Sequence, residues 1–171
     1  LSTYAQVTPI WEKSAAQGTK PAWFDTGHLT RGLAYGNVGG NDYVFVVSRN
    51  GGSFIYMLNA ATGDSLGKLT NGASVTGGTY TVSDVEVSED GVIYVCNLAV
   101  GGTFKVYKFA SITDTATVAL TFDATGKRLG DKFTVTGKAS DNSLTIWAAS
   151  ASTAEYVKFT TADNGATFTP T

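Results

Sequence analysis

Charge is scarce in this sequence. Asp, Glu, Lys and Arg together make up 15% of its 171 residues, which is well below the usual quarter. The net charge of -2 and the lack of any basic run argue against electrostatic binding to nucleic acid or to anionic lipid. We therefore expect no nucleic-acid partner. Thr, Ser, Ala, Gly and Asn replace the missing charge, a composition common in secreted bacterial β-proteins.

Long hydrophobic runs are also missing. The longest apolar stretches, such as Tyr43 to Val47, have the length of a strand and are far shorter than a membrane span. Hydrophobic residues still form 43% of the chain, which excludes wholesale disorder and suffices for the core of one domain. The sequence has no Asn-x-Ser/Thr acceptor for N-glycans. We expect a secreted or cell-surface protein of a bacterium or archaeon, the periplasm included.

Cysteine and histidine occur once each, as Cys96 and His28. An internal disulfide is impossible, and Cys96 is expected to be buried in an apolar strand. A Cys/His zinc site is excluded within one chain. No Gly-x-Ser-x-Gly elbow supplies a nucleophile for His28, so we assign no catalytic residue and interpret His28 as a loop or interface residue.

One strand pattern occurs three times, at a period of about fifty residues. In its second copy Val82–Ser88 is followed by the turn Glu89-Asp90-Gly91, by Val92–Asn97, and then by Thr103–Phe109. The first copy spans residues 32–58 and the third spans residues 131–159. Aromatic and β-branched runs separated by Gly-Gly, Asn-Gly and Asp-Gly turns predict strands joined by tight turns.

The repeat predicts an all-β fold of three propeller-blade-like units, each of about four antiparallel strands. We place the units at about 27–70, 78–122 and 127–169, after an N-terminal arm over residues 1–26. Closed propellers need about four blades or more. Three units therefore predict an incomplete propeller or one completed by oligomerisation, so that the chain self-associates or is part of a longer protein.

Three segments carry a family resemblance: Arg31-Gly-Leu-Ala-Tyr, Leu-Asn-Ala-Ala-Thr-Gly-Asp (58–64) and Gly-Asp-Lys-Phe-Thr-Val-Thr-Gly (130–137). They resemble an uncharacterised family of secreted bacterial propeller domains of unknown function, and residues 87–97 resemble the strand, Asp-Gly turn and strand of soluble propellers. The resemblance covers most of residues 23–170. It implies the fold and no activity, since that family has no assigned chemistry.

Four side chains on the predicted inner strands are candidate ligands for Ca²⁺, which oxygen ligands alone can hold. They are Asp84, Glu86, Asn97 and Asp131. The competing interpretation is that Asp84 and Asp131 accept hydrogen bonds from backbone amides of the neighbouring unit. No other cofactor is indicated.

Association is expected to use the N-terminal arm, with residues 6–10 pairing as a strand on a neighbour. The arm would also pack on the first unit through Trp23 and Phe24. The expected interface residues are Gln6, Val7, Ile10, Trp11, Trp23 and His28.

Most of the apolar strand residues should form the core. The aliphatic and Phe set is Val44, Val46, Ile55, Val85, Val87, Ile93, Val95, Val106, Phe133, Val135, Ile146 and Val157. Aromatic residues that recur at equivalent positions are likewise expected in the core: Tyr35, Tyr43, Phe45, Phe54, Tyr56, Tyr94, Phe104, Tyr107, Phe109, Trp147, Tyr156 and Phe159.

Three functions remain open. The first is a secreted, non-enzymatic β-repeat module for interaction, adhesion or surface architecture, with a protein or glycan ligand. The second is a self-assembling subunit of an extracellular filament or layer. The third is a propeller hydrolase or lyase with a cation bound in the channel.

Overall fold

The computed structural model describes residues 8–171, and these form strands, turns and loops without a helix. No helix that would cross a membrane is present in this part of the chain. The strands build three antiparallel sheets, each a meander in chain order. The predicted all-β class and the three blade-like units are thus confirmed.

The first sheet contains β1 (Thr30–Val38), β2 (Asn41–Ser48), β3 (Phe54–Asn59) and β4 (Ser65–Lys68). The second contains β5 (Tyr80–Val87), β6 (Ile93–Val100), β7 (Thr103–Phe109) and β8 (Thr117–Asp123). The third contains β10 (Phe133–Thr136), β11 (Thr145–Ala149), β12 (Tyr156–Thr160) and β13 (Thr169–Pro170).

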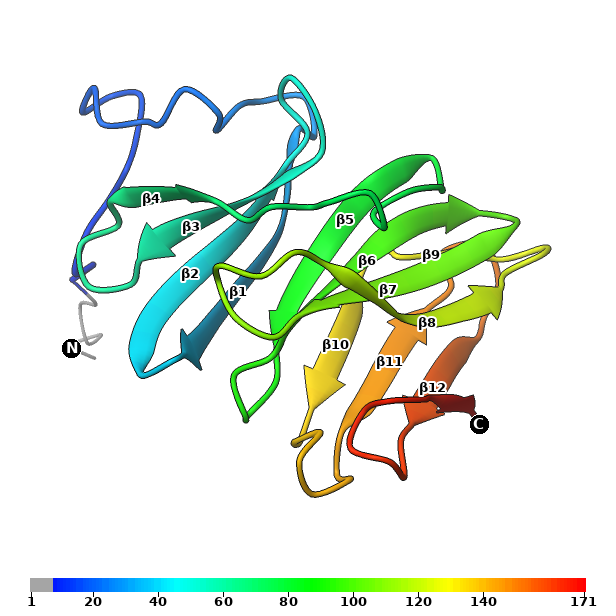
Figure 1. Cartoon of the computed structure of the whole chain (residues 1–171). Coiled ribbons are helices and arrows are strands. Elements are labelled where there is room, and N and C mark those ends of the chain that lie inside the picture. Colours follow the sequence, from blue (N-terminus) through cyan, green and yellow to red (C-terminus); the bar gives the residue numbers. More distant parts are fainter. Residues whose placement is uncertain (1–7) are drawn as a thin grey trace, which may run out of the picture.

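The three sheets lie side by side in an open array, with the second sheet in the middle (Figure 1). The inner strands β1, β5 and β10 run in the same direction (Figure 1). Two apolar clusters hold the array together, one between the first and second sheets and one between the second and third. Because both faces of the second sheet are covered, β6 is buried at seven of its eight residues. Strand β10, at the end of the array, alternates buried and exposed instead.

The first and second sheets approach closely at two glycines of β1. A Cβ on Gly32 would lie 2.6 Å from the Cα of Asp84, and one on Gly36 would lie 2.4 Å from a methyl group of Val87. Only residues without a side chain fit at these positions, since real Cβ atoms do not approach other atoms so closely. The small residues of β1 therefore face β5, and its larger residues Leu33 and Tyr35 face away, 61% and 62% exposed.

The third unit begins later than the sequence predicts. Arg128 and Leu129 form the short strand β9, which pairs with Val100 and Ala99 of β6 and so joins the second sheet. The register of β5 against β6 shifts between Tyr80 and Asp84. Strand β9 thus adds to the part of β6 that lies beyond this shift. Periodicity within the strands carries no signal for such a pairing.

Most of the predicted core is confirmed. Of the twelve aliphatic and Phe positions, only Val44, Val87 and Val157 are half-buried, and the rest are buried. The expectation was wrong for two aromatic residues, because Tyr35 and Tyr156 are 62% and 70% exposed. Phe54, Tyr56 and Trp147 are half-buried. Cys96 is buried and free, as predicted.

Candidate functional site

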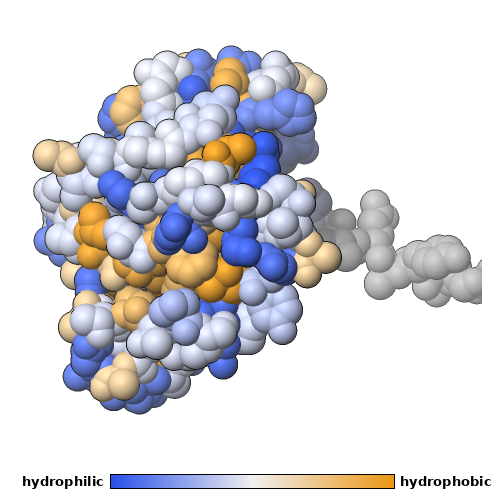
Figure 2. Space-filling view, turned by 90° about the vertical axis from the view of Figure 1, so that its right-hand side faces the viewer, coloured by the Kyte–Doolittle hydropathy of each residue, from blue (hydrophilic) through white to orange (hydrophobic). Residues whose placement is uncertain are grey.

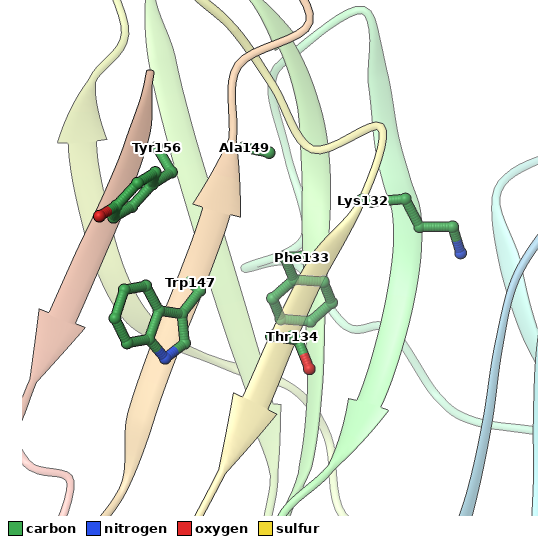
Figure 3. A pocket seen from close by; sticks show the side chains of 6 residues that line it. All are labelled: Lys132, Phe133, Thr134, Trp147, Ala149 and Tyr156. Carbon is green, nitrogen blue, oxygen red and sulfur yellow. The ribbon is translucent and has the colours of Figure 1, made fainter. Parts of the chain in front are cut away.

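The outer face of the third sheet carries an open apolar surface, which we call the Trp147 face: Trp147, Ala149 and Tyr156 together with Phe133, Thr134 and Lys132. These residues line a shallow hollow of about 370 Å³. In Figure 3, Trp147 and Tyr156 project from the neighbouring strands β11 and β12, while the Lys132 side chain points away from them.

The alternation of β11 produces this face. Ile146 and Ala148 point into the core and are fully buried, so Trp147 between them points outward. Its ring lies 5.7 Å from that of Tyr156, and the ammonium group of Lys158 lies 5.1 Å from its centroid. Figure 2 shows the side of the molecule at the right of Figure 1, where hydrophobic residues lie between hydrophilic ones. Because Trp147 and Tyr156 recur at equivalent positions of the repeat, the sequence predicted both in the core. The alternation along β11, however, already indicates that Trp147 lies on the opposite face of the sheet from Ile146 and Ala148.

At the other end of the array, the N-terminal arm covers part of the outer face of the first sheet. Trp23 stacks on Tyr56 with ring centroids 4.2 Å apart and planes inclined by 7°. Trp11 donates from Nε1 to the carbonyl oxygen of Ala60 at 2.8 Å, and Lys13 pairs with Asp64 at 2.8 Å. The predicted packing of the arm through Trp23 is confirmed.

The other predicted interface residues are placed as follows. Residues 8–29 form no strand, so the strand expected over residues 6–10 is not present at its described end. Gln6 and Val7 lie outside the described residues. Ile10 is 84% exposed, and His28 is exposed in a turn with a φ of 64°. Contact of these residues with another molecule stays a prediction.

Asp84 acts as a structural acceptor between two sheets. Its carboxylate is 1% exposed and accepts hydrogen bonds from the amides of Phe133 at 3.2 Å and Val85 at 3.1 Å, while the Lys132 ammonium group lies 3.4 Å away. Burial raises its pKa, and Lys132 and the two amides oppose that rise. The bond to Phe133 of the neighbouring unit is the one that the competing interpretation of Asp84 predicts.

The other cation candidates do not assemble around Asp84. Asn97 is fully buried and bonded within its own hairpin, because its Nδ2 donates to the carbonyl of Thr103 and its Oδ1 accepts from the amide of Lys105. Asp131 binds arginines rather than a backbone amide. No group of three His, Cys, Asp or Glu side chains suited to a metal ion occurs within residues 8–171.

Glu86 is the candidate with the most perturbed acidity. Its pKa is raised to about 7, first because burial disfavours its charged form, and second because the charge of Asp84 repels it. Lys132 opposes both effects. At neutral pH the carboxyl group of Glu86 is therefore close to half protonated, which makes it a poor ligand for a hard cation.

The fold resembles a solved one. A crystal structure of a DUF4623 family protein from Bacteroides eggerthii superposes with a TM-score of 0.67 at 21% sequence identity. The match covers 82% of this chain and 33% of that one, so this chain spans about a third of the length of that protein. The likeness concerns the fold alone.

No curated protein matches this chain. The model of a family described as a domain of unknown function, DUF8500, matches residues 33–170, a range that includes all three sheets except the first three residues of β1. The chain therefore belongs to the DUF8500 family.

Proposed function

We propose that this chain is a non-enzymatic β-repeat module that acts by association, and that the Trp147 face binds the first-sheet end of a second copy. The observation that carries the proposal is that Tyr156 is 70% exposed beside half-buried Trp147, on a sheet face with an open apolar hollow. A bacterial or archaeal extracellular setting, supported by the low charge of the sequence, completes the proposal.

The second copy is favoured because the opposite end of the array is also apolar and exposed. Leu33 and Tyr35 of β1 are 61% and 62% exposed, and Ile10 beside them is 84% exposed. A contact between two different faces of identical chains is head-to-tail, and it closes into a ring or continues as a filament. Two copies would bring six blade-like sheets together, within the range of about four to eight blades that closed propellers contain.

The packing between neighbouring sheets within the chain shows how such a contact between two copies would be built. Both internal interfaces bury alternating apolar residues of facing sheets, and aromatic side chains such as Phe104 and Phe159 lie within them. Covering Trp147 and Tyr156 in the same manner would remove aromatic area from water and stabilise the contact. The hydrolase or lyase alternative has less support, because its cation candidates are separately bonded.

The test is sedimentation velocity over a range of protein concentrations. The wild-type chain should gain mass with concentration. The double variant Trp147→Ser/Tyr156→Ser and the double variant Leu33→Ser/Tyr35→Ser should each remain monomeric. Val100→Ser, which changes a residue that is 56% exposed at the end of β6, is the matched control and should associate like the wild type.

Mixing the two double variants decides whether the contact is head-to-tail. Each retains one intact face, so the mixture should form a dimer and nothing larger. A wild-type chain that stays monomeric up to about millimolar concentration, where contacts of about 4 kcal/mol are half formed, would overturn the proposal. Association that survives both double substitutions would overturn it too.

A further inference from the structure

All three arginines of the sequence meet at one end of the inner strands. Arg31 lies in β1, Arg49 directly follows β2, and Arg128 lies in β9. They come from two sheets and are separated by up to about a hundred residues of sequence. The inner strands run in parallel, so their starting ends, where Arg31 and Asp131 lie, face the same side of the molecule (Figure 1).

One carboxylate, that of Asp131, lies within ion-pair distance of two of these arginines. Arg128 holds Asp131 with two hydrogen bonds, Nε to Oδ2 at 2.5 Å and Nη2 to Oδ1 at 2.8 Å. Arg31 lies 3.6 Å from Oδ1 of the same carboxylate. A bidentate pair of this kind satisfies Asp131 largely through Arg128. Arg31 is left with most of its donors free for another acceptor.

Arg49 adds a further positive charge without a carboxylate of its own. Its guanidinium group lies 3.7 Å from the centre of the Tyr80 ring, and its Nη2 donates to Oγ of Ser83 at 2.9 Å. Its Nε is buried without a hydrogen-bond partner, and no Asp or Glu of residues 8–171 pairs with it. Burial lowers its pKa, and the charges of Arg31 and Arg128 lower it further while Asp131 opposes them. Arg49 is therefore close enough to Arg31 and to Arg128 for their charges to repel it.

A hollow of about 310 Å³ opens beside this cluster, lined by Thr30, Arg31, Gly32, Asp131 and Lys132. The ammonium group of Lys132 is at its rim, because that side chain is 73% exposed while it lies 3.4 Å from buried Asp84. Four cationic side chains thus lie near the carboxylates of Asp84 and Asp131, and the charge of Lys132 also acts on the carboxyl group of Glu86. The region carries an excess of positive charge in a chain whose net charge is -2.

We propose that this hollow is an oxyanion-binding site, which takes a carboxylate or phosphate group of a ligand on Arg31 and Lys132. The planar fork of Arg31 supplies paired donors that match such a group, and Lys132 supplies a mobile ammonium group. Arg49 and Arg128 contribute positive charge without contacting the ligand. Arg128 also neutralises the charge of Asp131. Bound oxyanion would relieve the repulsion among the arginines. The site shares Lys132 with the Trp147 face but does not rest on the proposed function.

The experiment is an NMR titration of the labelled chain with three probes: inorganic phosphate, D-glucuronate, and neutral D-glucose as the blank. Phosphate or glucuronate should cause saturable shifts at the amides of Thr30, Gly32 and Lys132, and glucose should not. Tighter binding of glucuronate than of phosphate would identify a carboxylate ligand, and the reverse would identify a phosphate ligand.

Variants distinguish binding at this site from nonspecific attraction of an anion to positive charge. Arg31→Gln and the surface variant Lys132→Gln should each weaken binding about tenfold, as loss of a charge-assisted bond does. Arg49→Gln should weaken it less and reduce its salt dependence. Lys138→Gln removes one exposed charge elsewhere on the third unit and should bind like the wild type. Non-saturating shifts with all probes, or equal binding by Lys132→Gln and Lys138→Gln, would overturn the proposal.

Discussion

The first and third sheets occupy the two ends of the array, yet the chain attaches and covers them differently. The first sheet meets the second through an apolar cluster and a close approach at Gly32 and Gly36, and its outer face carries the arm with Trp23 on Tyr56. The third sheet meets the second through larger side chains and one carboxylate, Asp84, and its Trp147 face is open. Close backbone packing makes the first interface intolerant of added atoms, whereas the second depends on a hydrogen bond that a deletion removes.

Asp84→Ala tests the carboxylate that joins the third sheet to the second. It leaves the amide of Phe133 without its acceptor and opens a gap in a buried position, so we expect a loss of about 2–4 kcal/mol in the free energy of unfolding. Urea denaturation measures the loss. Asp84→Asn keeps one acceptor oxygen and should lose clearly less. Equal losses for the two variants would contradict the assigned role.

Gly36→Ala tests the glycine contact of the first sheet. The added methyl group would lie 2.4–2.8 Å from the side-chain carbons of Val87, so the sheets must separate slightly, at a cost of about 1–3 kcal/mol. The second change Val87→Ala removes two of the three overlapping carbons and should restore part of the stability. A double-mutant cycle by urea denaturation measures this coupling. Additive losses would show that the two residues do not meet.

Trp23→Ala and Trp147→Ala compare the covered end with the open end directly. Trp23 is stacked between the arm and the first sheet, and its removal should cost about 1–2 kcal/mol and speed proteolysis within residues 8–29. Trp147 is half-buried beside Tyr156 with no covering segment within the described residues, so its removal should cost less than that of Trp23, below about 1 kcal/mol. Thermal melts at low concentration measure both. A larger loss for Trp147 than for Trp23 would reverse the comparison.

The sequence predicted the units well because strand alternation and turn chemistry are local. Asn164 and Gly165, for example, adopt the positive φ values of 56° and 75° that their turn was expected to require. The exposure of Tyr35 and Tyr156 was missed, since a repeat shows which positions are equivalent but not which sheet lacks a neighbour. The arginine cluster was missed for a related reason: Arg31, Arg49 and Arg128 have no common spacing and meet only through the packing of whole sheets.

Glu86→Gln gives the smallest effect and tests the carboxylates on the inner strand of the middle sheet. The pKa of Glu86 is raised to about 7 in the folded chain from its ordinary value of 4.5, so the folded state holds this proton more tightly than the unfolded state. Stability linked to the group is fully present below about pH 4.5 and is lost as the pH rises toward 7. Glutamine does not titrate and keeps the neutral shape. The variant should therefore match the wild type near pH 4.5 and exceed its free energy of unfolding by about 1 kcal/mol at pH 8, the modest size reflecting solvent screening. Urea denaturation at both pH values measures the difference, with Glu12→Gln on the exposed arm as the matched control. A gain of the same size at both pH values would show that burial of the Glu86 charge is not its source.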